Sequence, residues 1–152
     1  MLRIPLVVIC SPTATGKTIL AMKLAEAVAG EIVSADSLQV YRYLDIGTAK
    51  PTRAERERVM HHLIDVVDPD GEFNAAIYAE QARTIIEKLA GVGKPVFVVG
   101  GTGLYIRTLL QGIIATPPVD ESIRNYYREI RDRQGKEYLF ELLQARDPQA
   151  AQ

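Results

Sequence analysis

Apolar residues along this chain gather into short unbroken runs that are separated by longer amphipathic stretches. The runs at residues 6–10, 31–35 and 95–99 centre on valine and isoleucine, a composition typical of strands buried on both faces of a parallel sheet. Residues 63–67 predict a further strand, although Asp65 interrupts its apolar pattern. Helical periodicity and breaker residues predict helices at 17–29, 53–60, 74–89, 102–111, 121–133 and 136–145.

This alternation of strands and helices predicts an α/β fold with a parallel sheet, right-handed crossovers and flanking helices. We expect an α/β core over residues 1–116 and, beyond the Pro117-Pro118 turn, a helical segment over residues 117–152. Only three or four strands are predicted, whereas a typical sheet has about five or six. We therefore expect a sheet that is incomplete at the C-terminus and a chain that is a fragment of a longer protein.

A phosphate-binding loop is predicted between the first strand and the first helix, the context that such a loop requires. It reads Ser11-Pro12-Thr13-Ala14-Thr15-Gly16-Lys17-Thr18. Backbone N–H groups and the helix N-terminus would hold phosphate oxygens, Lys17 would add a positive charge, and the Thr18 hydroxyl would ligate Mg²⁺. Ser11 stands where the pattern has glycine, which is awkward if its φ is positive. The motif predicts a P-loop NTPase-like sheet that binds a di- or triphosphate.

Asp36 is the acidic residue best placed to face bound phosphates. It follows the second predicted strand, and ligands of parallel sheets bind outside the carboxyl ends of the strands. The strand at 95–99 leads into Gly100-Gly101-Thr102, so the Mg²⁺-holding acid that most ATPases and GTPases carry on a second strand is missing. The alternative role for Asp36 is that of a turn or helix cap.

Composition narrows the class of protein further. With 18 Lys+Arg, 19 Asp+Glu and a net charge of −1, bulk charge does not point to a nucleic-acid binder. The single cysteine, Cys10, is interpreted as a small buried hydrophobe, and cysteine usage favours a cytoplasmic protein. No apolar run approaches the ~20 residues of a membrane span. The pair His61-His62 is interpreted as structural, because no cysteine or third histidine completes a metal site.

Four later segments carry a family resemblance. They read SADSLQVY at residues 34–41, DIGTAKP at 45–51, HHLID at 61–65 and GGTGLY at 100–105. Together with the phosphate loop, in this order, they make the chain resemble the tRNA isopentenyltransferase (tRNA dimethylallyltransferase) family from residue 6 to about residue 151. Chains of that family continue into further basic segments, so the resemblance makes residues 117–152 the start of a tRNA-facing insertion.

The resemblance implies transfer of a dimethylallyl group from dimethylallyl diphosphate to the exocyclic amine of an adenosine next to the anticodon of tRNA. It assigns the phosphate loop to the diphosphate with Mg²⁺, Asp36 to the general base and Thr102 to the reacting centre. The implied tRNA contacts are Asp36, Ser37, Leu38, Gln39, Thr102 and Arg124. The implied partners are dimethylallyl diphosphate and the tRNA anticodon stem-loop, with the complete protein a monomer.

Three other functions stay open from the residues alone. A small-molecule kinase of the shikimate or adenylate type shares the phosphate loop and places an Asp after its second strand. A related transferase prenylates free adenine nucleotides, although residues 35–37 and 47–50 look like the tRNA-acting branch. The third alternative is a chain that binds diphosphate without catalysing transfer.

Overall fold

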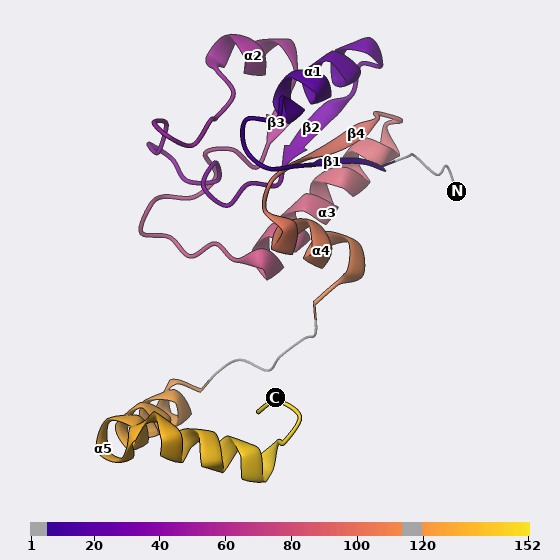
Figure 1. Cartoon of the computed structure of the whole chain (residues 1–152). Helices are drawn as coiled ribbons and strands as arrows, with labels where there is room; N and C mark the ends of the chain where they lie inside the picture. The colour runs from indigo at the N-terminus through magenta and orange to yellow at the C-terminus, as the bar shows by residue number, and fades with distance from the viewer. Residues whose placement is uncertain (1–5, 114–119) are drawn as a thin grey trace. The chain divides into compact units, whose positions relative to one another are not determined.

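The computed structural model describes residues 6–113 and 120–152, which fall into two compact units divided between Ile113 and Ile114. The first unit contains the sheet and four helices, and the second contains α5 (Figure 1). Among the described residues, no helix combines the length and the apolar character needed to cross a membrane.

The first unit is built on a parallel sheet of four strands in the order β1-β4-β2-β3. These strands are β1 (Leu6–Cys10), β2 (Glu31–Ser34), β3 (His61–His62) and β4 (Val96–Gly100). The inner strand β4 is buried along its whole length, because it pairs with β1 and β2 along its two edges and packs against helices on both faces. The predicted parallel α/β sheet is therefore confirmed.

Two expectations about the edges of this sheet are wrong. Strand β1 is not buried on both faces: within the described chain it pairs only with β4, and both Val7 and Cys10 are exposed. The strand predicted at 63–67 is replaced by the shorter β3, two residues earlier. Leu63 and Asp65 adopt φ angles of 59° and 57°, in the left-handed region, so the chain leaves the strand there.

The helices of the first unit are α1 (Lys17–Ala27), α2 (Arg53–Arg58), α3 (Ala75–Gly91) and α4 (Gly103–Gln111). Asn74 caps α3, because its Oδ1 accepts hydrogen bonds from the backbone N–H groups of Ala76 and Ile77. Thr52 and Glu55 form a reciprocal capping box at α2. Local sequence therefore determines where these helices begin.

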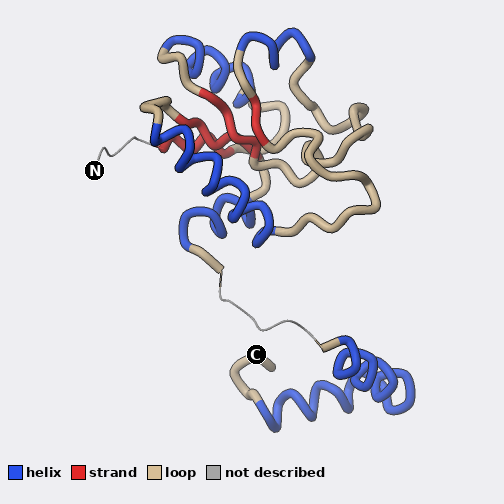
Figure 2. Tube along the Cα trace, turned by 180° about the vertical axis from the view of Figure 1, so that it is seen from behind, coloured by secondary structure: helices blue, strands red, loops and turns tan. Residues whose placement is uncertain are grey.

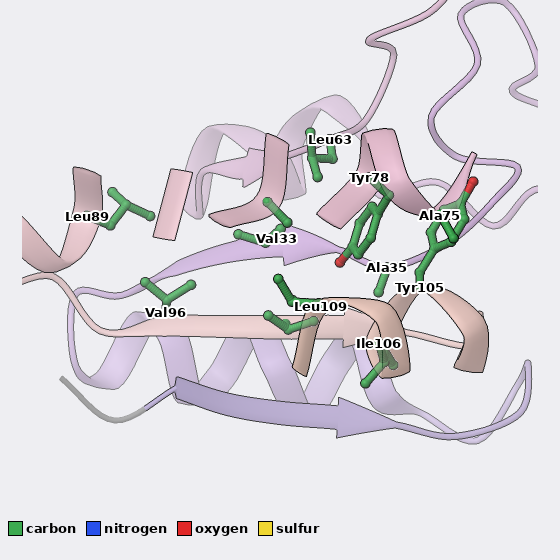
Figure 3. Close-up of a cluster of buried hydrophobic side chains, with 12 residues drawn as sticks. Val33, Ala35, Leu63, Ala75, Tyr78, Leu89, Val96, Tyr105, Ile106 and Leu109 are labelled. Atoms are coloured by element: carbon green, nitrogen blue, oxygen red, sulfur yellow. The ribbon is translucent and has the colours of Figure 1, made fainter. Parts of the chain in front are cut away.

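Alternate residues of β4 face two different apolar layers, as the pleat of a strand requires. Val96 and Val98 face the layer of α3 and α4, where the Tyr78 and Tyr105 rings stack at 4.5 Å (Figure 3). Phe97 and Val99 belong to the opposite cluster, which includes Ala21, Met22 and Ala25 of α1. The sheet thus lies between helices on both faces (Figures 1 and 2).

The second unit consists of α5 (Glu121–Arg146), which begins at the N-cap Asp120. Gly135 has φ 88° and ψ 171°, outside the helical region, and divides α5 into two arms. The two helices predicted at 121–133 and 136–145 are confirmed as these arms. Within the unit, Arg146 donates a hydrogen bond to the Tyr127 hydroxyl at 3.3 Å.

Candidate phosphate and acid–base site

The phosphate loop connects β1 to α1 and leaves the start of that helix open to a ligand. Gly16 is the N-cap with φ 84°, and no side chain of the described residues caps the helix. The first turn of α1 contains no acidic residue, so its free N–H groups and the positive end of the helix dipole face outward. This is the geometry expected of an anion site.

The loop itself is closed by its own side chains. The Thr15 hydroxyl donates to the Pro12 carbonyl at 3.0 Å and is hydrogen-bonded to the Ser11 hydroxyl. Lys17 Nζ donates to the same carbonyl at 3.2 Å. Ser11 does not need a positive φ. The left-handed residues of this loop are Ala14, with φ 66°, and Gly16, with φ 84°, while the φ of Ser11 is not positive. A serine therefore fits the first position of this loop without backbone strain.

Asp36 lies with the phosphate loop in one cleft at the carboxyl ends of the strands. This cleft of about 360 Å³ is lined by Lys17, Thr18 and Asp36 together with Leu38 and Gln39, and by residues 13–19 and 47–49 in part. A smaller cavity of about 20 Å³, room for one water, shares Lys17, Thr18, Asp36 and Gln39. The expected approach of Asp36 to the phosphate loop is thus present.

The Asp36 carboxylate also caps the turn that follows β2. Its Oδ1 accepts hydrogen bonds from the N–H groups of Leu38 at 2.9 Å and Gln39 at 3.3 Å. Oδ2 accepts no hydrogen bond from the described residues. The cap alternative therefore coexists with a role in the cleft, because one oxygen is used by the turn and the other is available to a ligand.

Thr102 is held next to Asp36 by a close approach of two backbone segments. A Cβ placed on Gly100 would lie 2.1 Å from the Ala35 carbonyl oxygen, so only glycine fits there. The Thr102 N–H donates to that carbonyl at 3.1 Å, and the Thr102 hydroxyl accepts from the Ser37 N–H at 2.9 Å. Asp36, Ser37 and Thr102 are thereby brought together across two strands.

Gln39 uses its amide within the protein. Its Oε1 accepts from the Ser34 hydroxyl at 3.0 Å, and its Nε2 donates to the carbonyls of Thr48 and Ala49 at 3.2 and 3.1 Å. Both amide donors therefore hold residues 48–49 as a wall of the cleft. Leu38, by contrast, is half exposed at the mouth of the cleft.

A buried ionic network supports this wall from behind. The Lys50 side chain is 3 % exposed, and its ammonium contacts Asp65 at 2.7 Å, Asp45 at 2.9 Å and the Tyr41 carbonyl at 2.7 Å. Asp65 also pairs with Arg56 at 2.6 Å. Burial alone would lower the pKa of Lys50, but its hydrogen bonds to Asp65 and Asp45 outweigh burial and raise the pKa. The network keeps residues 41–50 in one conformation.

His61 is a part of the site that sequence reasoning interpreted only as structural. Its ring lines the small cavity beside Lys17 and Thr18. Nδ1 lies 2.7 Å from the Val59 carbonyl, and the buried Nε2 has no hydrogen-bond partner among the described residues. Burial lowers the pKa of His61, so its imidazole is neutral near pH 7. The HHLID segment was the sequence feature that could have pointed to His61, but a sequence motif does not show which of its two histidines faces a cavity.

The remaining predicted tRNA contact, Arg124, belongs to the second unit. Arg124 is on α5 in the second unit, where its guanidinium pairs with Glu121 at 2.9 Å. Within residues 6–113 and 120–152, no group of three or more His, Cys, Asp or Glu side chains is arranged to hold a metal ion. His62 pairs with Glu31 at 2.7 Å, in agreement with the structural role expected for this residue.

Comparison with known proteins gives a consistent result. The family model described as IPP transferase matches residues 39–152. The chain is 54 % identical over 146 residues to tRNA dimethylallyltransferase 2 of Syntrophus aciditrophicus, covering 96 % of this chain and 47 % of that protein. The chain thus spans about half the length of the curated relatives it matches.

Two solved structures share the fold. The tRNA isopentenylpyrophosphate transferase of Bacillus halodurans is 39 % identical with a TM-score of 0.72, and the match covers 98 % of this chain and 50 % of that one. A eukaryotic dimethylallyltransferase described as acting on tRNA is 29 % identical with a TM-score of 0.82, over 96 % of this chain and 36 % of that one. The sheet is therefore the P-loop NTPase-like sheet that the motif predicts.

Proposed function

Because this chain belongs to the IPP transferase family, we propose that it supplies the diphosphate-binding and proton-accepting part of a tRNA dimethylallyltransferase. The reaction forms a bond between the exocyclic amine of an adenosine and the allylic carbon, and it breaks the bond from that carbon to the diphosphate oxygen. The observation that carries the proposal is the single cleft shared by Lys17, Thr18 and Asp36.

The phosphate loop would bind the diphosphate of dimethylallyl diphosphate. Negative charge grows on the leaving diphosphate as the carbon–oxygen bond breaks, and the N–H groups at the start of α1, which no side chain of the described residues caps, would stabilise that charge. The Lys17 ammonium contacts only the Pro12 carbonyl at 3.2 Å among the described residues, so it is available to a phosphate oxygen. Both groups stabilise the transition state more than the ground state.

Asp36 would take the proton that the adenosine amine loses. That amine is a weak nucleophile because its lone pair is delocalised into the ring, so attack requires removal of a proton. The oxygen Oδ2 is free of hydrogen bonds from the described residues, whereas Oδ1 fixes the orientation of the carboxylate. Thr102, hydrogen-bonded to Ser37 beside it, would steady the amine or the bridging oxygen.

Mg²⁺ fits this cleft as a cofactor. The Thr18 hydroxyl, which lines the cleft next to Lys17, would be its protein oxygen ligand. Mg²⁺ binds through one or two protein oxygens and completes its shell with water and phosphate oxygens. When bound, the ion would neutralise charge on the diphosphate, while Lys17 and the loop amides position it.

We also propose that residues 117–152 begin the tRNA-facing part of the enzyme. α5 carries the most basic stretch of the sequence, which includes Arg124, Arg128 and Arg131. Contacts of these arginines with the RNA backbone would supplement base recognition at Asp36, Ser37, Leu38 and Thr102, while Gln39 would shape the wall of the cleft against which the base lies. The natural acceptor would be the anticodon stem-loop.

Calorimetry on the 152-residue chain tests the diphosphate half of the proposal. Dimethylallyl diphosphate with Mg²⁺ should bind more tightly than ATP, and Lys17→Ala should abolish measurable binding. The matched control is Lys23→Ala, on the same helix but outside the residues that line the cleft. Tighter binding of ATP would favour the kinase alternative, and equal affinity of wild type and Lys17→Ala would refute the assignment of the loop.

A chimera tests the transfer itself. This chain is continued by the second half of a curated relative, and radiolabelled dimethylallyl diphosphate is supplied with an anticodon stem-loop. Transfer to the stem-loop, and not to AMP in competition, is expected. Preferential labelling of AMP would instead support the transferase that acts on free adenine nucleotides.

A further inference from the structure

The loop between β2 and α2 ends in an apolar tip that lies outside the cleft. This tip, residues 43–46, contains Tyr43, Leu44 and Ile46. Ile46 is 99 % exposed and Tyr43 is 78 % exposed. Single exposed apolar side chains are ordinary on protein surfaces, but neighbours gathered on one short loop form a patch, and patches mark interaction sites.

The tip does not fold back onto the core because the loop is fixed at its base. The Thr48 hydroxyl donates to the Leu44 carbonyl at 2.7 Å. The buried Lys50 ammonium binds the Tyr41 carbonyl and the Asp45 carboxylate, one on each side of the turn. Tyr43 itself is held at φ 64°, a conformation that costs an aromatic residue free energy. The backbone of the tip is therefore held in a conformation that exposes Tyr43 and Ile46 to solvent.

The tip is continuous with the candidate site. The residues that follow it, 47–49, line the cleft together with Asp36. Leu38, 51 % exposed, extends the apolar rim from the other end of the loop. In both views the segment between β2 and α2 extends beyond the carboxyl ends of the strands (Figures 1 and 2). A ligand that enters the cleft on this side therefore meets the tip.

The charges around the tip do not favour phosphate contact. The Asp45 carboxylate is paired with Lys50 at 2.9 Å, and the Arg42 guanidinium is paired with Asp68 at 3.0 Å. What the tip offers is the ring of Tyr43 and the aliphatic surface of Ile46. Such side chains bind flat apolar groups, and nucleobases are the flat groups available in a nucleic acid.

We propose that residues 43–46 form a docking surface for an unstacked nucleobase adjacent to the one that enters the cleft. The proposal rests on the proposed function. A nucleotide that is extruded from a stack leaves its neighbours with an uncovered face, and aromatic or aliphatic side chains replace the lost stacking. The partner is thus single-stranded RNA in a loop, bound by stacking rather than by its phosphates.

Fluorescence anisotropy with the chimera of this chain and the second half of a curated relative tests this docking surface. The probe is a labelled RNA stem-loop with adenosines in its single-stranded loop, titrated at low salt. Tyr43→Ser should weaken binding by about 5- to 150-fold, the range measured when a stacking side chain is removed. Ile46→Ser should weaken it in the same direction. Neither change should alter binding of dimethylallyl diphosphate, because neither residue lines the cleft.

The matched control is Val92→Ser. Val92 is 71 % exposed and follows α3 just before β4, so it lies at the amino ends of the strands, the opposite edge of the sheet. Its removal should leave RNA affinity unchanged. A blunt duplex with the same stem should bind wild type and both tip variants equally.

Equal RNA affinity of wild type and both tip variants would overturn the proposal, and so would absence of stem-loop binding by the wild type. In that case the tip would be a contact for protein rather than RNA. Calorimetry of dimethylallyl diphosphate separates this failure from failure of the proposed function. Binding that depends on Lys17 would leave the diphosphate assignment standing, whereas its absence would contradict that assignment independently.

Discussion

Asp36 combines two tasks that a single substitution can separate. Asn keeps an oxygen that accepts the N–H groups of Leu38 and Gln39, so Asp36→Asn preserves the turn after β2. It removes the negative charge and the affinity for a proton. In the chimera, we expect near-normal diphosphate binding and a loss of transfer by roughly 10²–10⁴-fold, the usual contribution of general base catalysis.

The control for this experiment is Asp36→Ala, which removes the cap as well as the base. It should lower the melting temperature, whereas Asp36→Asn should not. Turnover of Asp36→Asn within a factor of a few of the wild type would mean that Asp36 serves only the turn.

The close backbone contact at Gly100 leads to a prediction about the free energy of unfolding. A methyl group there would lie 2.1 Å from the Ala35 carbonyl oxygen, and two backbone segments in a sheet cannot separate without breaking their pairing. Gly100→Ala should therefore cost at least about 3 kcal/mol of unfolding free energy, at the upper end of overpacking effects. Urea unfolding followed by circular dichroism measures this cost.

Gly91 provides the comparison. It belongs to α3, and a Cβ there meets no atom within 4 Å. Gly91→Ala should stabilise the protein by about 0.5–1 kcal/mol, because alanine is the better helix former. If both variants behaved alike, the close approach at Gly100 would not constrain the site.

Positions that depend on neighbours in sequence were predictable. The local pattern placed Gly16, Lys17 and Thr18 at the start of α1, and it placed Asp36 close behind β2. Positions that depend on distant partners were not predictable. Cys10 is exposed because β1 pairs on one side only within the described chain, and sequence does not show which strand lies at an edge. His61 faces a cavity that α1 helps to form, far along the chain.

At the scale of elements, the loop over residues 41–50 depends on one buried ion. Lys50→Met keeps much of the side-chain volume but removes the charge that Asp65 and Asp45 contact. We expect a loss of about 1.5–3 kcal/mol at pH 7, the cost of removing hydrogen bonds to a charged group. The control Arg53→Met breaks the solvent-exposed pair with Glu57 and should cost about 0–1 kcal/mol.

The acid side of the stability curve reports on the same network. Burial alone would raise the pKa of Asp65, but Lys50 and Arg56 outweigh it and hold the pKa below its usual value. A depressed pKa contributes stability above the ordinary carboxyl pKa of about 4, and this contribution disappears as the pH falls through the folded-state value. Between roughly pH 5 and pH 2, the wild type should therefore lose more unfolding free energy than Lys50→Met, as measured by urea unfolding.

The elements also show where pattern reading reaches its limit. The segment 63–67 has the apolar composition of a strand, but the Asp65 carboxylate pairs with Lys50 and Arg56 and its backbone is left-handed. Those partners come from a loop and a helix that periodicity alone does not place beside it. By contrast, β1 and α3 match prediction closely, because an apolar run and the Asn74 cap are properties of the segment itself.

At the scale of the molecule, α1 carries an apolar stripe that the described chain leaves uncovered. Leu20, Leu24 and Val28 recur every four residues and are 52 %, 40 % and 50 % exposed. We expect the second half of the complete enzyme to cover them. Leu24→Gln should change the unfolding free energy of the 152-residue chain by less than about 0.5 kcal/mol, as for surface positions. In the chimera it should cost about 2 kcal/mol or more.

The same reasoning predicts that the 152-residue chain binds diphosphate without transferring the prenyl group. The phosphate loop is local to β1 and α1, whereas a net charge of −1 provides little of the attraction on which tRNA binding usually depends. Thin-layer detection of labelled stem-loop should show no product with this chain and clear product with the chimera. Robust transfer by the chain alone would show that the second half is dispensable.

The position of β4 at the centre of the sheet has a consequence for how the protein folds. The strands that carry the phosphate loop and Asp36, β1 and β2, do not pair with each other, and in the sheet β4 lies between them. Leu6 of β1 pairs with Val96 of β4, so this pairing cannot form until residue 96 has been synthesised. Contacts so distant in the chain close slowly. On a ribosome, the two halves of the cleft would therefore stay apart until β4 has emerged, and the nascent chain would acquire its affinity for diphosphate in a single late step.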